Sequence, residues 1–139
     1  MTNLVITNEM VAYAAASLAL EGCDPSVLLD AHNVPTYLTD EDGVLVYAND
    51  ACEEFAGRTP VPGVDRWCVT WKLYTDAGEF LPHDQCPMAV AIREQRAIRG
   101  ASAVAERPDG TRIPFKPFPT PVFGPDGRLS GAVNVLMPW

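Results

Sequence analysis

Three Asp-Gly pairs divide this chain, at Asp42-Gly43, Asp109-Gly110 and Asp126-Gly127, and each lies between apolar or β-prone runs. Asp-Gly is a strong signal for a β-hairpin, because glycine readily adopts the positive φ that a primed tight turn requires. One pair lies early and two lie close together near the C-terminus, with an apolar-periodic stretch typical of a helix between them. This order predicts a twisted antiparallel sheet with helices inserted in its middle.

Length and charge limit the classes of function that the chain can have. Its 139 residues favour one domain, and its net charge is −8. An acidic surface repels phosphate groups, so nucleic acid and anionic membranes are not expected as partners. No apolar run reaches the length of a membrane span, and residues 1–20 lack the basic start and the cleavage site of a signal peptide. We therefore expect a cytoplasmic location.

The N-terminal residues 1–22 are predicted to form an amphipathic helix that precedes a single domain at residues 23–139. Asn8 is a suitable N-cap and Gly22 a suitable stop for a helix over residues 9–21. Its apolar stripe is rich in alanine, so a partner surface can approach it closely. The stripe consists of Val11, Ala14, Ala15 and Leu18.

The rest of the chain alternates strand and helix signals. A hairpin is expected at residues 35–39 and 44–48, a short helix at 51–56 capped by Asn49 or Asp50, and a helix from Pro87 to about Ala97, closed near Gly100. Three strands are expected at residues 99–107, 111–123 and 129–137. Residues 66–85 show no clear pattern, and within them residues 66–71 are compatible with either a helical turn or an extended segment.

The middle one of these closing strands contains four prolines, at positions 114, 117, 119 and 121. Proline has no backbone N–H to donate to a ladder. The strand is therefore expected to be irregular past Phe115, or to turn its free N–H sides outward.

The order of elements, two strands, several short helices and three strands, resembles that of a PAS (Per-Arnt-Sim) sensory domain. Tyr37-Leu-Thr-Asp-Glu-Asp-Gly-Val-Leu-Val-Tyr-Ala-Asn49 resembles the opening PAS hairpin, and Ala51-Cys-Glu-Glu-Phe-Ala-Gly57 the helix after it. Glu106-Arg-Pro-Asp-Gly-Thr-Arg112 and Gly124-Pro-Asp-Gly-Arg-Leu-Ser-Gly-Ala-Val133 resemble the two closing hairpins. The resemblance covers roughly residues 26–137.

This resemblance implies an α+β fold with a five-stranded antiparallel sheet, one face of which forms a small pocket under short helices. In the family, the pocket holds haem, flavin, another chromophore, a metabolite or nothing. The domain converts ligand occupancy, redox state or light into altered protein–protein contacts, as in two-component regulation. Many members pair through a helix N-terminal to the core, so we expect a homodimer through Val11, Ala14, Ala15 and Leu18, and a separate signalling effector as a further partner.

The segment His83-Asp-Gln-Cys-Pro-Met88 is the first candidate for a binding site. A Cys-Pro pair resembles haem-regulatory motifs, and His83 is an alternative ligand for haem iron. The same residues have a purely structural interpretation. His83 and Asp84 would cap a helix that Pro87 opens, while Cys86 and Met88 would fill the core.

The second candidate is Arg66-Trp-Cys-Val-Thr-Trp71, whose two tryptophans are suited either to stacking a planar ligand or to closing the core. Cys68 invites comparison with light-sensing flavin PAS domains, whose reactive cysteine lies in Gly-x-Asn-Cys-Arg-Phe. Here the segment is Gly63-Val-Asp-Arg-Trp-Cys68, which argues against a flavin photoadduct. The four cysteines lack metal-knuckle spacing, so free thiols and no metal site are expected.

We therefore expect a non-catalytic sensory domain that binds a small ligand or a protein partner. The cofactor is left unknown, with haem as a candidate and flavin argued against. Ile113 and Phe115, like Val133 and Val135, keep the spacing of one strand face. The residues expected around the pocket are Trp67, Trp71, His83, Cys86, Met88, Phe115 and Val133.

Two alternatives to this function stay open. One is a dimerisation or scaffold module whose pocket is filled by its own side chains. The other is a small cone-shaped α+β enzyme, for which the sequence offers no converging carboxylate and donor, so no catalytic residue is expected.

Overall fold

The computed structural model describes residues 34–138. The predicted N-terminal helix, its apolar stripe and the division of the chain at residue 22 lie outside the described residues.

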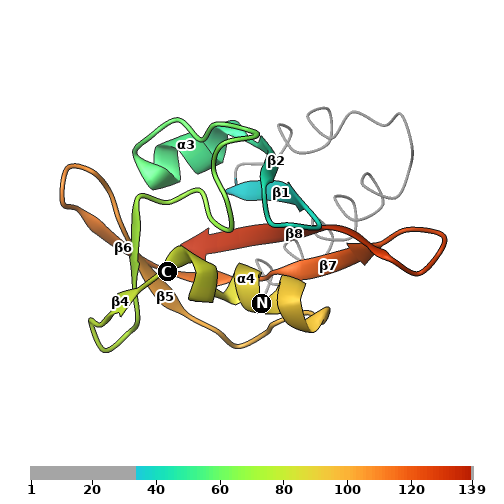
Figure 1. Cartoon of the computed structure of the whole chain (residues 1–139). Coiled ribbons are helices and arrows are strands. Elements are labelled where there is room, and N and C mark those ends of the chain that lie inside the picture. Colours follow the sequence, from blue (N-terminus) through green and yellow to red (C-terminus); the bar gives the residue numbers. More distant parts are fainter. Residues whose placement is uncertain (1–33, 139) are drawn as a thin grey trace.

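One antiparallel sheet of eight strands runs through the described part of the chain (Figure 1). Along the sheet the order is β2-β1-β8-β6-β5-β3-β4, and β7 also pairs with β8. Two α-helices and a 3-10 turn complete the fold. The strands are β1 (Thr36–Asp40), β2 (Leu45–Ala48), β3 (Lys72–Tyr74), β4 (Phe80–Leu81), β5 (Ala103–Glu106), β6 (Arg112–Pro117), β7 (Thr120–Phe123) and β8 (Leu129–Pro138); the helical elements are α3 (Asp50–Ala56), η1 (His83–Gln85) and α4 (Pro87–Glu94).

The expected five strands are all present, but the sheet contains three more. One extra strand arises because the proline-rich segment divides into β6 and β7 around Phe118 and Pro119. The other two, β3 and β4, form a hairpin inside the region that the sequence left open. β3 pairs with β5, so this hairpin extends the sheet at one edge.

The prolines fit because β6 is staggered between its two neighbours. It pairs with β5 through residues 112–115 and with β8 through residues 115–117, so the two ladders share Phe115 alone. Each proline therefore has one side on which no partner strand needs its N–H. The strand continues regularly to Pro117, two residues beyond the point at which irregularity was expected.

The hairpins at the Asp-Gly pairs use three-residue loops in place of the predicted primed turns, and the first loop is Glu41-Asp42-Gly43, as expected. At the first, Asp40 N–H donates to Val44 O (2.9 Å) and Gly43 N–H donates to Asp40 O (3.1 Å). The aspartates of these three pairs do not adopt a positive φ. Among the described non-glycine residues, a positive φ occurs at Trp67 and Gln95. Each loop thus follows the other common solution, a type I turn closed by glycine in the left-handed region.

The β3–β4 hairpin follows the same rule. Thr75 N–H donates to Glu79 O (2.8 Å), and Gly78, the third loop residue, has φ of 85°. A glycine at the third position of a short polar stretch is therefore the sequence signal that indicates this hairpin.

At the helix ends, the predicted caps of α3 are confirmed, whereas the predicted C-terminal end of α4 is not. Asn49 caps α3 by accepting the Cys52 N–H at 3.2 Å, and Gly57 closes the helix with φ of 66°, as predicted. By contrast, α4 ends at Glu94, because Gln95 adopts the left-handed conformation and bonds back to Ala91 O. The expected extension to Ala97 and Gly100 is wrong.

The sheet has an apolar cluster on each face. The first cluster joins the sheet to α3 and α4, and includes Cys52, Phe55, Met88 and Ile92 from the helices. Residues from β1, β8, β6 and β5 supply its other side, among them Tyr37, Leu136, Phe115 and Ala103. The second cluster is smaller and is formed by Leu38, Val122, Val133 and Val135, with Val34, Tyr47 and Phe118 packed against it.

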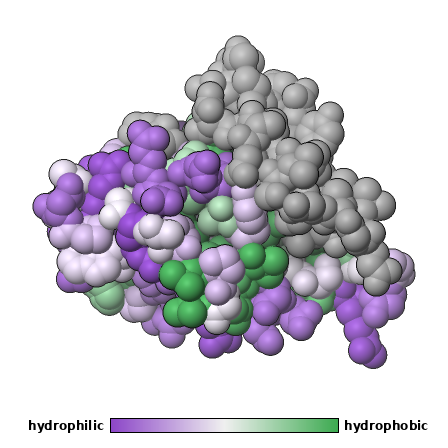
Figure 2. Space-filling model, turned by 90° about the horizontal axis from the view of Figure 1, so that it is seen from above, coloured by the Kyte–Doolittle hydropathy of each residue, from purple (hydrophilic) through white to green (hydrophobic). Residues whose placement is uncertain are grey.

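The surface seen from above is largely hydrophilic, with hydrophobic side chains gathered in one compact area (Figure 2). Among the described residues, large apolar side chains are exposed on β2, on the loop after α3, next to β3, on β4 and on β7, at Val46, Val61, Val64, Trp71, Phe80 and Phe123. Exposed apolar surface is thus concentrated in a few places, as is usual for a folded domain.

Substituting Gly43 with alanine should lower the free energy of unfolding by more than about 2 kcal/mol. Gly43 has φ of 82°, and a Cβ there would collide with the ring of Trp67. Gly78→Ala is the matched control, because Gly78 has φ of 85° and open space around it. It should cost about 1 kcal/mol in urea denaturation. Equal losses would show that the Trp67 contact contributes nothing.

Candidate functional site

A chain of hydrogen bonds begins at Tyr37 on β1. The hydroxyl of Tyr37 on β1 donates to the carbonyl oxygen of Trp67 at 2.7 Å. Asn134 lies directly opposite Tyr37 in the β1–β8 ladder, and its Nδ2 donates to the Tyr37 hydroxyl at 3.1 Å. Asn134 Oδ1 accepts the backbone N–H of Phe118 at 3.0 Å. One buried tyrosine therefore connects β1, β8 and the loop that carries Trp67.

Trp67 has an unusual backbone conformation, with φ of 70°. A bulky residue in the left-handed region costs about 1–3 kcal/mol, so its surroundings must hold it there. They do so through two hydrogen bonds, because the Trp67 N–H donates to Gly43 O at 2.8 Å and its carbonyl accepts the Tyr37 hydroxyl. The guanidinium of Arg66 stacks over the indole ring at 4.4 Å from the centroid.

The hydroxyl of Thr70 forms a second set of polar contacts, between the core and the surface. The Thr70 hydroxyl is 3.3 Å from Cys68 Sγ and 3.2 Å from His83 Nε2. A hydroxyl has one proton, so it donates to one of these two acceptors at a time. Thr70 is buried and His83 is half-buried, so this threonine links a core thiol to an imidazole near solvent.

The pKa of His83 is lowered from its ordinary value. Burial is the main cause, and the nearby Arg58 guanidinium adds to it, while Asp65 and Asp84 act in the opposite direction. Arg58 is held in place because it pairs with Asp65 at 3.0 Å and donates to Val69 O at 2.8 Å. The imidazole is therefore kept neutral to a lower pH than in a free histidine.

Three buried thiols and Tyr37 share the first cluster. Burial, with a smaller contribution from the neighbouring Cys68, raises the pKa of Cys86 to about 12. Burial also raises the pKa of Cys52 and of Tyr37, again with a smaller contribution from Cys68. Cys52 and Cys86 are therefore neutral thiols at physiological pH, and Cys68 is the neighbour common to all of these groups.

Most of the residues predicted around the pocket come together. Cys86, Met88 and Phe115 belong to the first cluster, and Trp67 packs against it. His83 lies at its margin, linked through Thr70.

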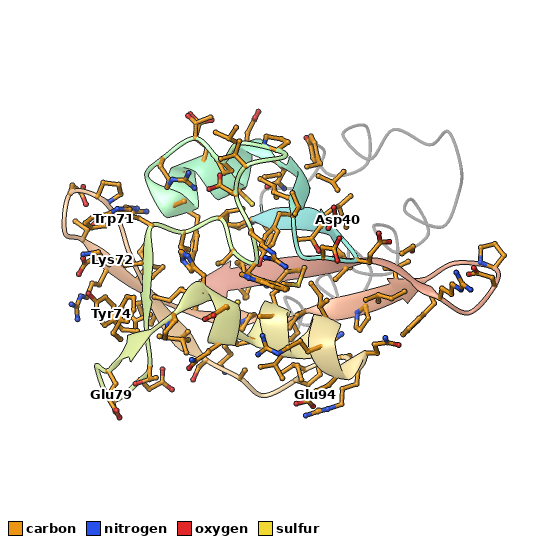
Figure 3. All side chains as sticks on the ribbon, in the orientation of Figure 1. Asp40, Trp71, Lys72, Tyr74, Glu79 and Glu94 are labelled. Carbon is orange, nitrogen blue, oxygen red and sulfur yellow. The ribbon has the colours of Figure 1, made fainter. Side chains whose placement is uncertain are left out.

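Trp71 lies apart from the other predicted residues, with 41% of its surface exposed. Lys72 Nζ lies 4.3 Å from its ring centroid. Trp71, Lys72 and Tyr74 follow one another at the edge of the molecule in Figure 3.

Val133 is also separate, because it belongs to the second cluster on the other face of the sheet. Ala132 and Leu136 point to the helices instead. The residues of β8 are apolar at both alternating sets of positions, so periodicity could not decide which set faces inward. The pairing of Tyr37 with Asn134 decides it.

The structure supports most of the structural interpretation of the His83–Met88 segment. Pro87 is the first residue of α4, and Cys86 and Met88 fill the core. The N-cap is Cys86, however, while His83 and Asp84 belong to η1. Within residues 34–138, no three His, Cys, Asp or Glu side chains gather in a way that could hold a metal ion.

Sequence reasoning did not single out Tyr37, Thr70 or Asn134. A signal for Asn134 was present, because it is a lone amide in the apolar run 131–137. A buried amide needs hydrogen-bonding partners, so such a position indicates an internal polar contact. Within the described residues, every buried side-chain nitrogen and oxygen has such a partner.

Comparisons with known proteins identify the fold. No family model and no curated protein matches the chain. Solved structures do match, among them a PAS domain of a protein from Colwellia psychrerythraea, with 15% identity, a TM-score of 0.52, and coverage of 80% of this chain and 90% of that one. The Rhodobacter sphaeroides LOV protein matches with 13% identity, a TM-score of 0.57, and coverage of 91% and 67%. The light-state dimer of the fungal blue-light photoreceptor Vivid matches with 18% identity, a TM-score of 0.56, and coverage of 75% and 76%.

Neither α-helix in the described part of the chain has the length and apolar character needed to cross a bilayer.

Replacing Tyr37 with phenylalanine should lower the free energy of unfolding by about 1–3 kcal/mol, because it leaves Trp67 O and Asn134 Nδ2 without their buried partner. Tyr74→Phe is the control, since the Tyr74 ring packs near the edge of the sheet against Phe80. It should change stability by less than about 0.5 kcal/mol in urea denaturation. Equal effects would contradict a special role for the Tyr37 hydroxyl.

The stability of the protein should fall as the pH drops below about 6.5, in part because of His83. Its pKa is lower in the folded state, so the unfolded chain binds more protons in this range and unfolding becomes easier. The loss should grow until the pH passes the lowered folded pKa.

Denaturant midpoints of the wild type and His83→Gln, measured from pH 7.5 to pH 5, check this prediction. The wild type should lose more stability than the variant over this range. A pH dependence that is identical in the two proteins would contradict it.

Proposed function

We propose that this chain, whose fold is that of the PAS and LOV domains, is a non-catalytic sensory domain that transmits its state through protein–protein contacts. The observation that carries this proposal is the hydrogen-bond chain through Tyr37. It couples strands β1 and β8 to the loop of Trp67, where a strained residue is held by two hydrogen bonds. A small change at that loop therefore reaches the strands of the sheet.

Flavin is a cofactor to be tested, because LOV structures are among the matches and one of them is described as a flavin-analogue study of a light-oxygen-voltage domain. The expectation from the sequence that the domain does not use flavin is therefore withdrawn. The described residues do not fit such a ring as they stand. Their buried polar side-chain atoms already have partners, and Tyr37, Met88 and Phe115 fill the space between sheet and helices.

Haem is a second candidate ligand, through His83 or Cys86. In the structure His83 Nε2 contacts the Thr70 hydroxyl, and Cys86 faces the apolar cluster. To bind the iron, His83 would therefore have to leave the Thr70 hydroxyl, or Cys86 would have to leave the apolar cluster.

A competing function is supported by the packing of the first cluster. Phe55 and Phe115 meet edge to face at 5.3 Å between centroids, and the large side chains of the cluster are fully buried. This arrangement suits a dimerisation or scaffold module that is filled by its own side chains.

Titration of the purified protein with hemin and with FMN, followed by absorbance and thermal unfolding, separates the two functions. A sensor should show a saturable shift with one of them, or a small molecule that co-purifies in native mass spectrometry. For haem, the shift should be lost in His83→Ala or Cys86→Ala and kept in His32→Ala, which removes the other histidine of the chain. Absence of any bound or binding molecule would favour the scaffold module.

Pairing through the apolar stripe of residues 9–21 belongs to the same proposal, as does a separate effector. The stripe suits close approach because two of its four residues are alanine, and one matched structure is described as a dimer. Light scattering after size exclusion should show a dimer for the full chain and a monomer after deletion of residues 1–22. Leu18→Glu is a milder second variant with the same expected result. A dimer that survives both changes would rule out this pairing surface.

A further inference from the structure

We infer that the last turn of α3, residues 54–57, is a gate to the first cluster, and that Arg107 is the latch that holds this gate closed. The gate opens while the rest of the domain stays folded. This inference deepens the proposed sensory function and rests on it, because it assigns the route by which a small ligand enters.

A small molecule that enters the first cluster must displace apolar side chains. Tyr37, Met88 and Phe115 are almost completely buried there, with at most 2% of their surfaces exposed. Phe55 on α3 meets Phe115 on β6 edge to face, at 5.3 Å between the ring centroids. Lifting Phe55 off Phe115 therefore opens the first cluster beside β6.

The first turn of α3 is anchored to β1 by buried hydrogen bonds. The Thr36 N–H donates to Asn49 Oδ1 and the Asn49 N–H donates to Thr36 O, each at 3.1 Å. The Cys52 thiol donates to Thr36 O at 3.3 Å. All three residues are buried, so water does not readily replace these bonds. This end of the helix is therefore fixed.

The last turn of α3 depends on a side chain from a distant part of the sequence. A cation stabilises the carbonyl end of a helix, but α3 has no basic residue in its own last turn. Arg107, which follows β5, supplies the charge. Its Nε donates to Phe55 O at 3.1 Å and its Nη2 donates to Glu54 O at 3.2 Å. In Figure 1 the β5–β6 loop that Arg107 opens lies beside α3.

The contact made by Arg107 can be released without disturbing the core. The arginine is half-buried, and its bond to Glu54 O is exposed to solvent. Water can therefore take the place of the guanidinium at the helix end, unlike at the buried first turn.

Gly57 provides a hinge next to the latch. It has φ of 66°, and a Cβ there would lie 2.9 Å from Arg107 Cδ, so the arginine stem packs directly against it. The loop that follows is held by its own contacts, because Arg58 pairs with Asp65 at 3.0 Å and donates to Val69 O at 2.8 Å. A change of backbone conformation at Gly57 can thus lift the last turn between two fixed segments.

The other helix, α4, is held differently. Four of its eight residues are buried, namely Met88, Ala89, Ala91 and Ile92. The chain after it is tied by a backbone bond, since the Ile98 N–H donates to Pro119 O at 3.1 Å. Release of one side chain does not free a helix held in this way, so the gate belongs to α3.

Amide hydrogen exchange of the full wild-type chain, resolved by residue with NMR, tests the gate. The Gly57 N–H bonds to Glu53 O at 2.9 Å, and the Val90 N–H of α4 bonds to Cys86 O at 3.0 Å. Relative to intrinsic rates, Gly57 should exchange at least about tenfold faster than Val90, and low urea should accelerate Val90 but not Gly57. Equal protection and equal urea dependence at the two amides would overturn the gate.

Variants of two arginines in the same hairpin test the latch. Arg107→Met keeps the apolar stem but removes the donors, and should raise the ratio of the Gly57 rate to the Val90 rate by about tenfold or more. Arg112→Met is the matched control. Arg112 bonds to Glu106 at 2.9 Å and stacks over Tyr74 at 4.1 Å, neither of which belongs to α3, so the ratio should stay unchanged. The same ratio in both variants would overturn the latch.

Arg107→Lys keeps the test decisive if Arg107→Met fails to fold. Lysine retains the charge but not the planar pair of donors, so the ratio should rise to an intermediate value, by about threefold. An unchanged ratio in Arg107→Lys would then overturn the latch.

The gate and the sensory function fail separately. If hemin or FMN binds while Gly57 and Val90 exchange together, the gate is rejected and the sensory function stands. If Gly57 exchanges by local opening but no ligand binds or co-purifies, the gate stands and its role in ligand entry is rejected. For a ligand that binds, Arg107→Met should speed association and dissociation by a similar factor, and an unchanged association rate would overturn the entry route.

Discussion

The hydrogen bond between Tyr37 and Asn134 is the contact on which the interior of this domain depends. It crosses from β1 to β8, two neighbouring strands that pair over five residues. It also fixes which side of β8 faces the helices, because Asn134 must point toward the tyrosine. Ala132 and Leu136 follow it inward, and Val133 and Val135 are left to the other face.

The same tyrosine holds the loop after α3 in its strained form. Trp67 keeps its left-handed conformation because Tyr37 and Gly43 bind its two backbone groups, and because Gly43 leaves room for the indole. Cys68 and Thr70 follow at once and reach His83 beside α4. Trp67 is thus linked to β1 through the Tyr37 hydroxyl and to the β1–β2 hairpin through Gly43.

Several elements could be predicted because their signals are local. The caps of α3 depend on Asn49 and Gly57 themselves, and Pro87 opens α4 through its own ring geometry. Other predictions failed where a distant partner decides. The prolines of β6 are accommodated by the stagger between β5 and β8, and α4 stops at Gln95, next to a chain that turns toward Pro119.

The sequence by itself determined the order of the five expected strands and two helices, the positions of the three Asp-Gly hairpins and the presence of soft and aromatic side chains near the middle of the chain. These follow from turn chemistry, capping and apolar spacing, which act over a few residues. The tertiary structure alone decided that Val133 and Trp71 lie away from the first cluster, and that Tyr37, Cys68, Thr70, His83 and Asn134 meet. Apart from Cys68 and Thr70, those residues are far apart along the chain, so the pairing of β1 with β8 and the packing of α4 on the sheet bring them together.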